Sequence, residues 1–223
     1  MEYIDIFDEN NNPIGTIKEK QQAHEDGNFH RTAHIWIINN KNELLLQKRS
    51  ATKKTHPNCW DISAAGHIKA GENVIDGAIR ELKEELGVEI EEKDLQYITT
   101  IKSTKNPKNM EFQYVYLLKC NKNVEQYIFK DGEVSDVKYI FYKDLEKMVK
   151  EKFEGILIHE EEYKYLFKYI THKNLTIRKC SSSDIDSIYN IQNIIIDNFK
   201  EEEKGYFLPF KKETYLRIVN DPI

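Results

Sequence analysis

The sequence predicts an α/β protein, and two observations lead to that expectation. Short runs rich in β-branched and aromatic residues, bounded by turn signals, fill much of the chain before residue 142. Two segments, residues 73–86 and the stretch EEEYKYLFKYI, instead repeat apolar residues at helical spacing. Strands and helices that are mixed along one chain are typical of this fold class.

The strands are expected in a definite order. EYIDIFD and TIKEK flank the turn signal ENNNPIG and predict a hairpin. RTAHIWIIN and ELLLQKR, separated by NKN, predict a second hairpin. Further strands are expected at WDISAAG, LQYITTIKST, MEFQYVYLLK and VKYIFY, with a helix starting at Lys143. Gly87 lies where a helix C-terminal cap is expected.

A polar break at residues 171–174 predicts a domain boundary, with one domain at 1–170 and a fragment at 174–223. TIRKC then indicates a strand, and SSSDIDSIYNIQNIIIDNF indicates a helix with Ser or Asp caps. The fragment resembles the first strand and helix of a GNAT acetyltransferase. It is too short for a complete domain and has no glycine-rich loop after Gly205, so we expect no acetyl transfer.

Composition excludes several classes of function. The formal net charge of −5 argues against a large nucleic-acid footprint, although it allows a small phosphorylated substrate. No apolar run approaches the roughly 20 residues that cross a bilayer, so no membrane association is expected. The acidic N-terminus is unlike a signal peptide. Three scattered cysteines indicate reduced thiols in a cytoplasmic protein.

The segment Gly66–Val88 carries the candidate chemistry. On a helix at residues 73–86, Glu81, Glu84 and Glu85 share one face, because residues three and four apart are neighbours. A separate stripe can face a core; its members are Ile75, Ala78, Ile79, Leu82 and Leu86. Three clustered carboxylates require a positive partner, and Mg²⁺ or Mn²⁺ with oxygen ligands would supply it.

A bare acidic cluster would ordinarily be a solvated surface, so the whole pattern decides. The segment resembles the Nudix box, G-x5-E-x7-R-E-U-x-E-E-x-G-U with U a bulky aliphatic residue. The match comprises Gly66, Glu72, Arg80, Glu81, Leu82, Glu84, Glu85, Gly87 and Val88. The resemblance covers about residues 1–168 and implies an α/β/α sandwich around a mixed sheet. It also implies a hydrolase that cleaves a diphosphate bond in a small substrate.

The same resemblance implies a role for each matching residue. Glu81, Glu84 and Glu85 would bind the divalent cation, Arg80 would orient them, and Glu72 would support the site. Gly66 would permit a close approach of the backbone to the site.

A second resemblance is to the type 1 isopentenyl-diphosphate isomerases, carried by HRTAHIWIIN, LLLQKRSATKKTHPNCW, AAGHIKAGE and MEFQYVYL. Those enzymes need a cysteine where this chain has Ala65, which cannot transfer a proton. Their histidine and glutamate metal site implies a second candidate site here at His30, His67 and Glu111. Asn109 stands where a further glutamate is expected. The spacing of His24 fits poorly, so an ordinary imidazole is favoured there.

Three further residues have open roles. Arg49 and Lys53 would contact the substrate diphosphate, or lie in a solvated loop. Glu133 would act as a base or an additional metal ligand. The leading function is a magnesium-dependent hydrolase; the alternatives are an isomerase-like enzyme and a catalytically silent nucleotide-binding domain. The sequence leaves open which diphosphate is the substrate and what the oligomeric state is.

Overall fold

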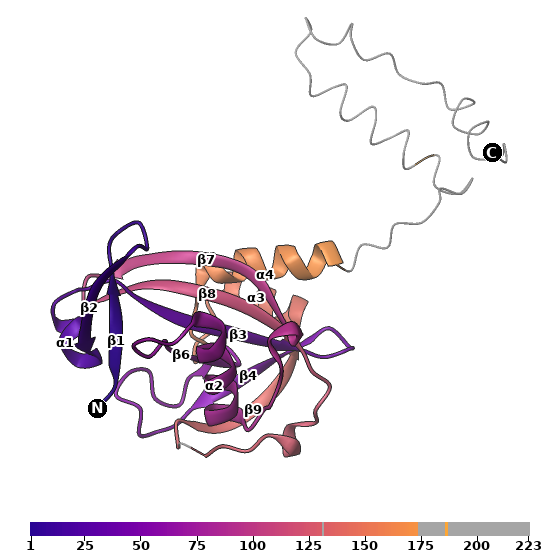
Figure 1. The fold of residues 1–223 in the computed structure, drawn as a ribbon. Coiled ribbons are helices and arrows are strands. Elements are labelled where there is room, and N and C mark those ends of the chain that lie inside the picture. Colours follow the sequence, from indigo (N-terminus) through magenta and orange to yellow (C-terminus); the bar gives the residue numbers. More distant parts are fainter. Residues whose placement is uncertain (131, 174–185, 187–223) are drawn as a thin grey trace, which may run out of the picture. The chain divides into compact units, whose positions relative to one another are not determined.

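A mixed seven-stranded sheet forms the centre of the protein (Figure 1). The computed structural model describes residues 1–130, 132–173 and Asp186. The strands are β3 (His30–Ile38), β4 (Glu43–Arg49), β5 (Trp60–Asp61), β6 (Ala64–His67), β7 (Leu95–Asn106), β8 (Asn109–Lys119) and β9 (Val134–Phe141). Strands β3 and β8 run parallel, and the other pairs are antiparallel. The expected α/β class and mixed sheet are therefore confirmed.

Helices cover both faces of the sheet (Figure 1). One core lies beneath α2 (Val74–Leu86) and includes Ile35, Leu82 and Leu86. The other lies beneath α3 (Tyr142–Lys150) and α4 (Glu160–Lys173), and it includes Trp36 and Leu166. Alternate residues of β3 enter the two cores, because successive side chains of a strand point to opposite faces. Two short 3₁₀ helices, at Glu92–Asp94 and Val124–Gln126, complete the connections.

The first predicted hairpin is confirmed as β1 (Tyr3–Phe7) paired with β2 (Pro13–Glu19). The second is confirmed only at its turn, since β3 and β4 pair at Ile38 and Leu44 and then separate. Strand β6 pairs with the first half of β3, while β9 pairs with β4. The expected single strand at WDISAAG is accordingly two strands, β5 and β6. Strand β6 carries Gly66 and lies beside α2.

Helix α2 ends as its sequence predicts, with Gly87 in the left-handed conformation at φ 63°. The sequence did not reveal α1 (Lys20–Glu25), a short helix that follows β2. Its one buried residue is Ala23, so it lacks the apolar periodicity that identifies a helix.

The chain divides into two compact units, residues 1–173 and 174–223. The GNAT-like fragment falls outside the described residues, apart from Asp186. Within the described part, the helices are too short or too polar to span a bilayer.

Candidate active site

Glu81 packs directly against the backbone of Gly66. A Cβ atom at position 66 would lie 2.0 Å from Glu81 Cδ and within 2.4 Å of both carboxylate oxygens. Any side chain at position 66 would therefore displace the Glu81 carboxylate from this position. The Glu81 side chain is 11% exposed. Burial raises the pKa of Glu81, while the charge of Arg80 opposes that shift.

Arg80 ties three carboxylates to the loop before the helix. Its Nε and Nη2 atoms donate to Glu72 at 2.9 and 2.8 Å, and Nη1 donates to Glu81 at 2.6 Å and Glu84 at 3.1 Å. Nη2 also donates to the His67 carbonyl at 2.9 Å. Because every contact is charge-assisted or to a backbone carbonyl, the guanidinium fixes the relative positions of loop and helix.

Glu85 is the most deeply buried carboxylate of the motif, at 3% exposure. One of its oxygens accepts from the Gln47 amide and from the Ala65 backbone N–H, both at 3.2 Å. Neither donor carries a charge. Burial, and then the neighbouring charge of Glu81, raises the pKa of Glu85 well above its ordinary value. The motif thus contains a buried carboxylate that no cationic side chain contacts among the described residues.

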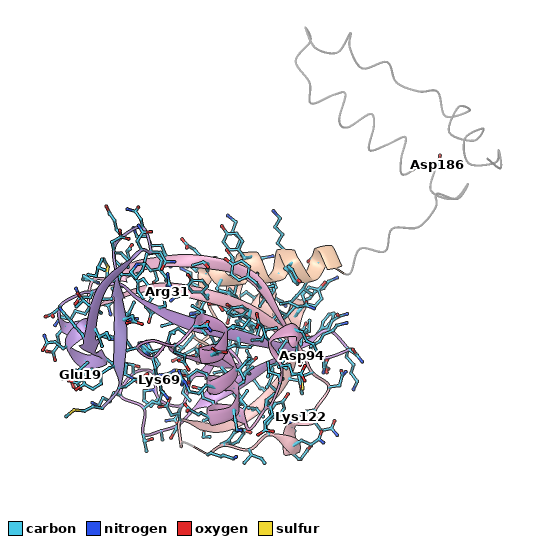
Figure 2. The ribbon with its side chains drawn as sticks, in the orientation of Figure 1. Glu19, Arg31, Lys69, Asp94, Lys122 and Asp186 are labelled. Atoms are coloured by element: carbon cyan, nitrogen blue, oxygen red, sulfur yellow. The ribbon has the colours of Figure 1, made fainter. Side chains whose placement is uncertain are left out.

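Glu84 lies at the exposed edge of the cluster, where its side chain is 46% exposed. It contacts Lys69 at 3.5 Å as well as Arg80. Lys69 is labelled in Figure 2, in the loop beside α2. The three glutamates expected on one helix face are therefore close together, with Glu81 and Glu85 buried and Glu84 accessible.

Glu133 and Lys53 lie close enough to Glu85 for their charges to affect its pKa. They form an ion pair with each other, and their charges act in opposite directions on the pKa of Glu85. The backbone strengthens this contact between loops, since Ser50 N–H donates to the Glu133 carbonyl at 2.8 Å. Both residues that the sequence singled out thus lie within electrostatic range of the carboxylates.

Arg49 has its hydrogen-bond partners within its own loop and at Asp61. Its guanidinium donates to the Thr55 carbonyl at 3.0 Å and to Asp61 at 3.1 Å. These contacts close the loop that carries Lys53. In this structure Arg49 orders the loop, and a direct contact with substrate would require it to release Asp61.

A cluster of three histidines lies beside the carboxylates and is brought together by α1, β3 and β6. The ring centroids of His24, His30 and His67 are 4.8 to 5.1 Å apart, and the Nε2 atoms of His24 and His67 lie 3.1 Å apart. His30 Nδ1 donates to the Asn28 carbonyl, while its Nε2 is fully buried and has no hydrogen-bond partner among the described residues. Glu111 lies 3.8 Å from that nitrogen. Burial lowers the pKa of both His24 and His67.

A second cluster of ionisable groups joins β3 and β5 to α4. His34 Nδ1 donates to Glu162 at 2.7 Å, and Trp36 Nε1 donates to the other oxygen of Glu162 at 2.5 Å. His159 Nε2 donates to Asp61 at 2.8 Å. Burial alone would lower the pKa of His34, but the charge of Glu162 raises it to about 9. This cluster therefore consists of paired charges, unlike the first.

The NUDIX domain family matches residues 28–167, which is more than half of the chain. This chain belongs to the Nudix family. The match includes the box, the sheet and most of α4, so the expectation of a hydrolase of the Nudix family is confirmed.

Individual relatives agree with this assignment. An uncharacterised Nudix hydrolase of Clostridium acetobutylicum is 35% identical over 78% of this chain and 88% of its own length. An isopentenyl-diphosphate Δ-isomerase of Photorhabdus laumondii is 34% identical over 62% of this chain and 77% of its own. A solved protein of Deinococcus radiodurans shares the fold, with a TM-score of 0.60 at 22% identity, over 75% of this chain and 98% of its own.

Sequence reasoning missed several residues of the candidate site and of the clusters near it. His24 was treated as an ordinary imidazole because its spacing fits poorly, yet α1 brings it into the histidine cluster. Gln47 contacts Glu85 from β4, and nothing local in the sequence distinguishes it from other strand glutamines. His34, His159 and Glu162 are 128 residues apart at the extremes and meet only in the folded chain.

Proposed function

We propose that this chain hydrolyses a diphosphate bond in a small substrate and that it depends on Mg²⁺ or Mn²⁺. Glu85 carries the proposal, because it is a buried carboxylate next to another carboxylate and has only neutral donors as described partners. A buried charge without a partner costs roughly several kcal/mol of stability unless a proton or a cation neutralises it. Nudix hydrolases generally use a divalent metal ion, which would provide that cation.

The donor atoms fit a hard divalent cation. Glu81, Glu84 and Glu85 offer carboxylate oxygens, which such ions prefer, and Gly66 leaves room for Glu81 at the base of the site. When bound, the ion polarises phosphoryl oxygens and lowers the pKa of a bound water. The raised pKa of Glu85 means that cations would compete with protons for this carboxylate.

The protein's own groups have separable tasks in this proposal. Arg80 holds Glu72 and Glu81 in fixed positions, so the ligand geometry exists before substrate binds. Lys53 provides a cationic side chain near Glu85 that can receive a phosphate oxygen once it leaves Glu133. Glu133 would act as a base or an additional ligand.

Substitution of Glu85 tests the proposal. A panel of nucleoside triphosphates, sugar nucleotides, dinucleotides and prenyl diphosphates, incubated with Mg²⁺, should contain at least one compound that is hydrolysed. Glu85→Gln should reduce that turnover by about 100-fold or more. Glu89→Gln is the matched control, because Glu89 is 75% exposed and lies outside the cluster. Equal turnover in both variants would remove Glu85 from the mechanism.

We also propose a second, nitrogen-rich metal site at His24, His30, His67 and Glu111. The buried Nε2 of His30 supports it: no group in the described part of the chain hydrogen-bonds to this nitrogen, and a buried nitrogen of that kind is rare unless it serves as a ligand. The hydrogen bond from Nδ1 to Asn28 fixes the tautomer that leaves Nε2 as the ligand atom. The lowered pKa values of His24 and His67 favour neutral imidazoles, as metal binding requires.

Metal analysis tests this second site independently of activity. In His30→Asn, the new side-chain amide can still donate to the Asn28 carbonyl from near the position of Nδ1. No atom replaces Nε2, the proposed metal ligand. The variant should lose one equivalent of bound transition metal by elemental analysis. His56→Asn is the control, because His56 is exposed and its positive φ of 48° suits asparagine. Equal metal content in both variants would contradict the site.

A further inference from the structure

His34 is hydrogen-bonded to Glu162 and lies on the strand that pairs with β6, whose backbone contacts Glu85. It lies on β3 directly opposite Ala65 of β6 in the antiparallel register. Opposed residues of antiparallel strands place their side chains on the same face, about 5 Å apart. Ala65 also donates its backbone N–H to Glu85. A single residue, Ala65, thus connects the carboxylate cluster with the face that bears His34.

Of the two ring nitrogens of His34, only Nδ1 has a hydrogen-bond partner among the described residues. Nδ1 donates to Glu162, whose second oxygen accepts from Trp36, so both oxygens of Glu162 are hydrogen-bonded. Within residues 1–130 and 132–173, no group hydrogen-bonds to Nε2. The side chain is 8% exposed, so this nitrogen is nearly buried yet reachable. The raised pKa keeps the ring protonated at neutral pH, which makes Nε2 a donor.

Thr32 provides a second polar atom on the same face. It precedes His34 by two residues, and residues two apart on a strand share a face. Its Oγ1 is buried and has no hydrogen-bond partner among the described residues. Buried polar groups in native proteins are nearly always paired, so the unpaired Thr32 Oγ1, on the same strand face as the free Nε2 edge of His34, indicates a polar ligand. A hydrocarbon group placed here would leave both unpaired.

We infer that His34 and Thr32 form a specificity site that binds a hydrogen-bond-accepting group of the substrate, such as a sugar hydroxyl or a carbonyl oxygen. Glu162 and Trp36 position His34 without touching the substrate. The inference rests on the proposed diphosphate hydrolase function and narrows it. The substrate has a polar group beyond its diphosphate, and prenyl diphosphates are poor substrates.

Two substitutions of His34 separate recognition from structural support. In His34→Asn, the side-chain amide can still donate to Glu162 from near the position of Nδ1, but no atom replaces Nε2. His34→Gln places its amide near Nε2 and loses the bond to Glu162. Kinetics would be measured with Mg²⁺ on sugar nucleotides and on geranyl diphosphate. Thr32→Val, which keeps the shape of the side chain, removes the second polar atom.

For sugar nucleotides, we expect His34→Asn and Thr32→Val each to lose about tenfold or more in kcat/KM, while His34→Gln retains most of it. Hydrolysis of geranyl diphosphate should not fall in any variant. A purely structural role for His34 gives the opposite order, with His34→Gln the more damaged, and would overturn the inference. So would a wild-type preference for geranyl diphosphate. If the wild type hydrolyses neither class or any other diphosphate, the proposed function fails, and this inference fails with it.

Discussion

Gly66→Ala should remove activity without removing the fold. The added Cβ would lie 2.0 Å from Glu81 Cδ, whereas carbon atoms in contact are about 3.5 Å apart. The carboxylate must therefore move by about 1.5 Å. Metal–ligand distances tolerate deviations of only about 0.2 Å. A misplacement of about 1 Å in an active site can cost about 100-fold, so we expect at least that loss in kcat.

Stability should respond differently from activity. Gly66 has an ordinary backbone conformation, since it is absent from the glycines with positive φ, and the clashing atoms end a flexible side chain. The melting temperature should therefore change by less than about 4 °C, the shift that roughly 1 kcal/mol produces in a domain of this size. Circular dichroism melts and steady-state kinetics on the same preparation would measure both quantities.

Gly15→Ala is the matched control for this substitution. Gly15 has a φ of 72°, and nothing lies within 4 Å of an added Cβ. The variant should lose stability through backbone strain, by roughly 1 kcal/mol, and keep its turnover. The reasoning about Gly66 is refuted if Gly66→Ala turns over at the wild-type rate, or if both variants lose activity in proportion to stability.

Three further predictions follow from the same contacts. Burial raises the pKa of Glu85 in the folded, metal-free protein. Above the ordinary carboxyl range, the unfolded chain has released this proton while the folded protein retains it. The stability of the folded protein therefore falls as pH rises through that interval. Glu85→Gln should therefore raise the metal-free melting temperature more at pH 8 than at pH 5, and an equal gain at both would contradict the cause. A chain ending at Lys173 should keep fold and turnover, because every candidate catalytic residue precedes it; insoluble or inactive protein would show that the remainder is needed. No deuterium should enter isopentenyl diphosphate from labelled water by NMR, since Ala65 has no exchangeable proton; label at the carbons that change in isomerisation would mean that another residue supplies it.

The helix and its carboxylates could be predicted because their information is local. Apolar residues at helical spacing fix α2, and Gly87 ends it through a conformation that glycine adopts readily. The positions of Glu81, Glu84 and Glu85 on one face then follow from helical geometry alone. What the spacing did not show is that Glu81 and Glu85 are buried while Glu84 is not, because burial depends on β6.

The sheet was less predictable, since strand pairing depends on distant segments. The turn between β3 and β4 indicates a hairpin, but beyond the turn β3 pairs with β6 and β4 pairs with β9. The histidine cluster depends on the same long-range pairing and on α1, whose sequence carries no clear helical pattern. His34 and Glu162 show the limit most clearly, because they are 128 residues apart and no local pattern relates them.

Hydrolysis in ¹⁸O-labelled water tests the central claim most directly. The wild-type chain, incubated with Mg²⁺ and a diphosphate that it cleaves, should place one ¹⁸O atom per turnover in a product phosphate, as mass spectrometry would show. Excess chelator should abolish that incorporation, and Glu85→Gln should slow it by about 100-fold or more. Continued turnover in excess chelator, or products whose phosphates carry no label, would contradict metal-dependent cleavage of a diphosphate bond at Glu81, Glu84 and Glu85.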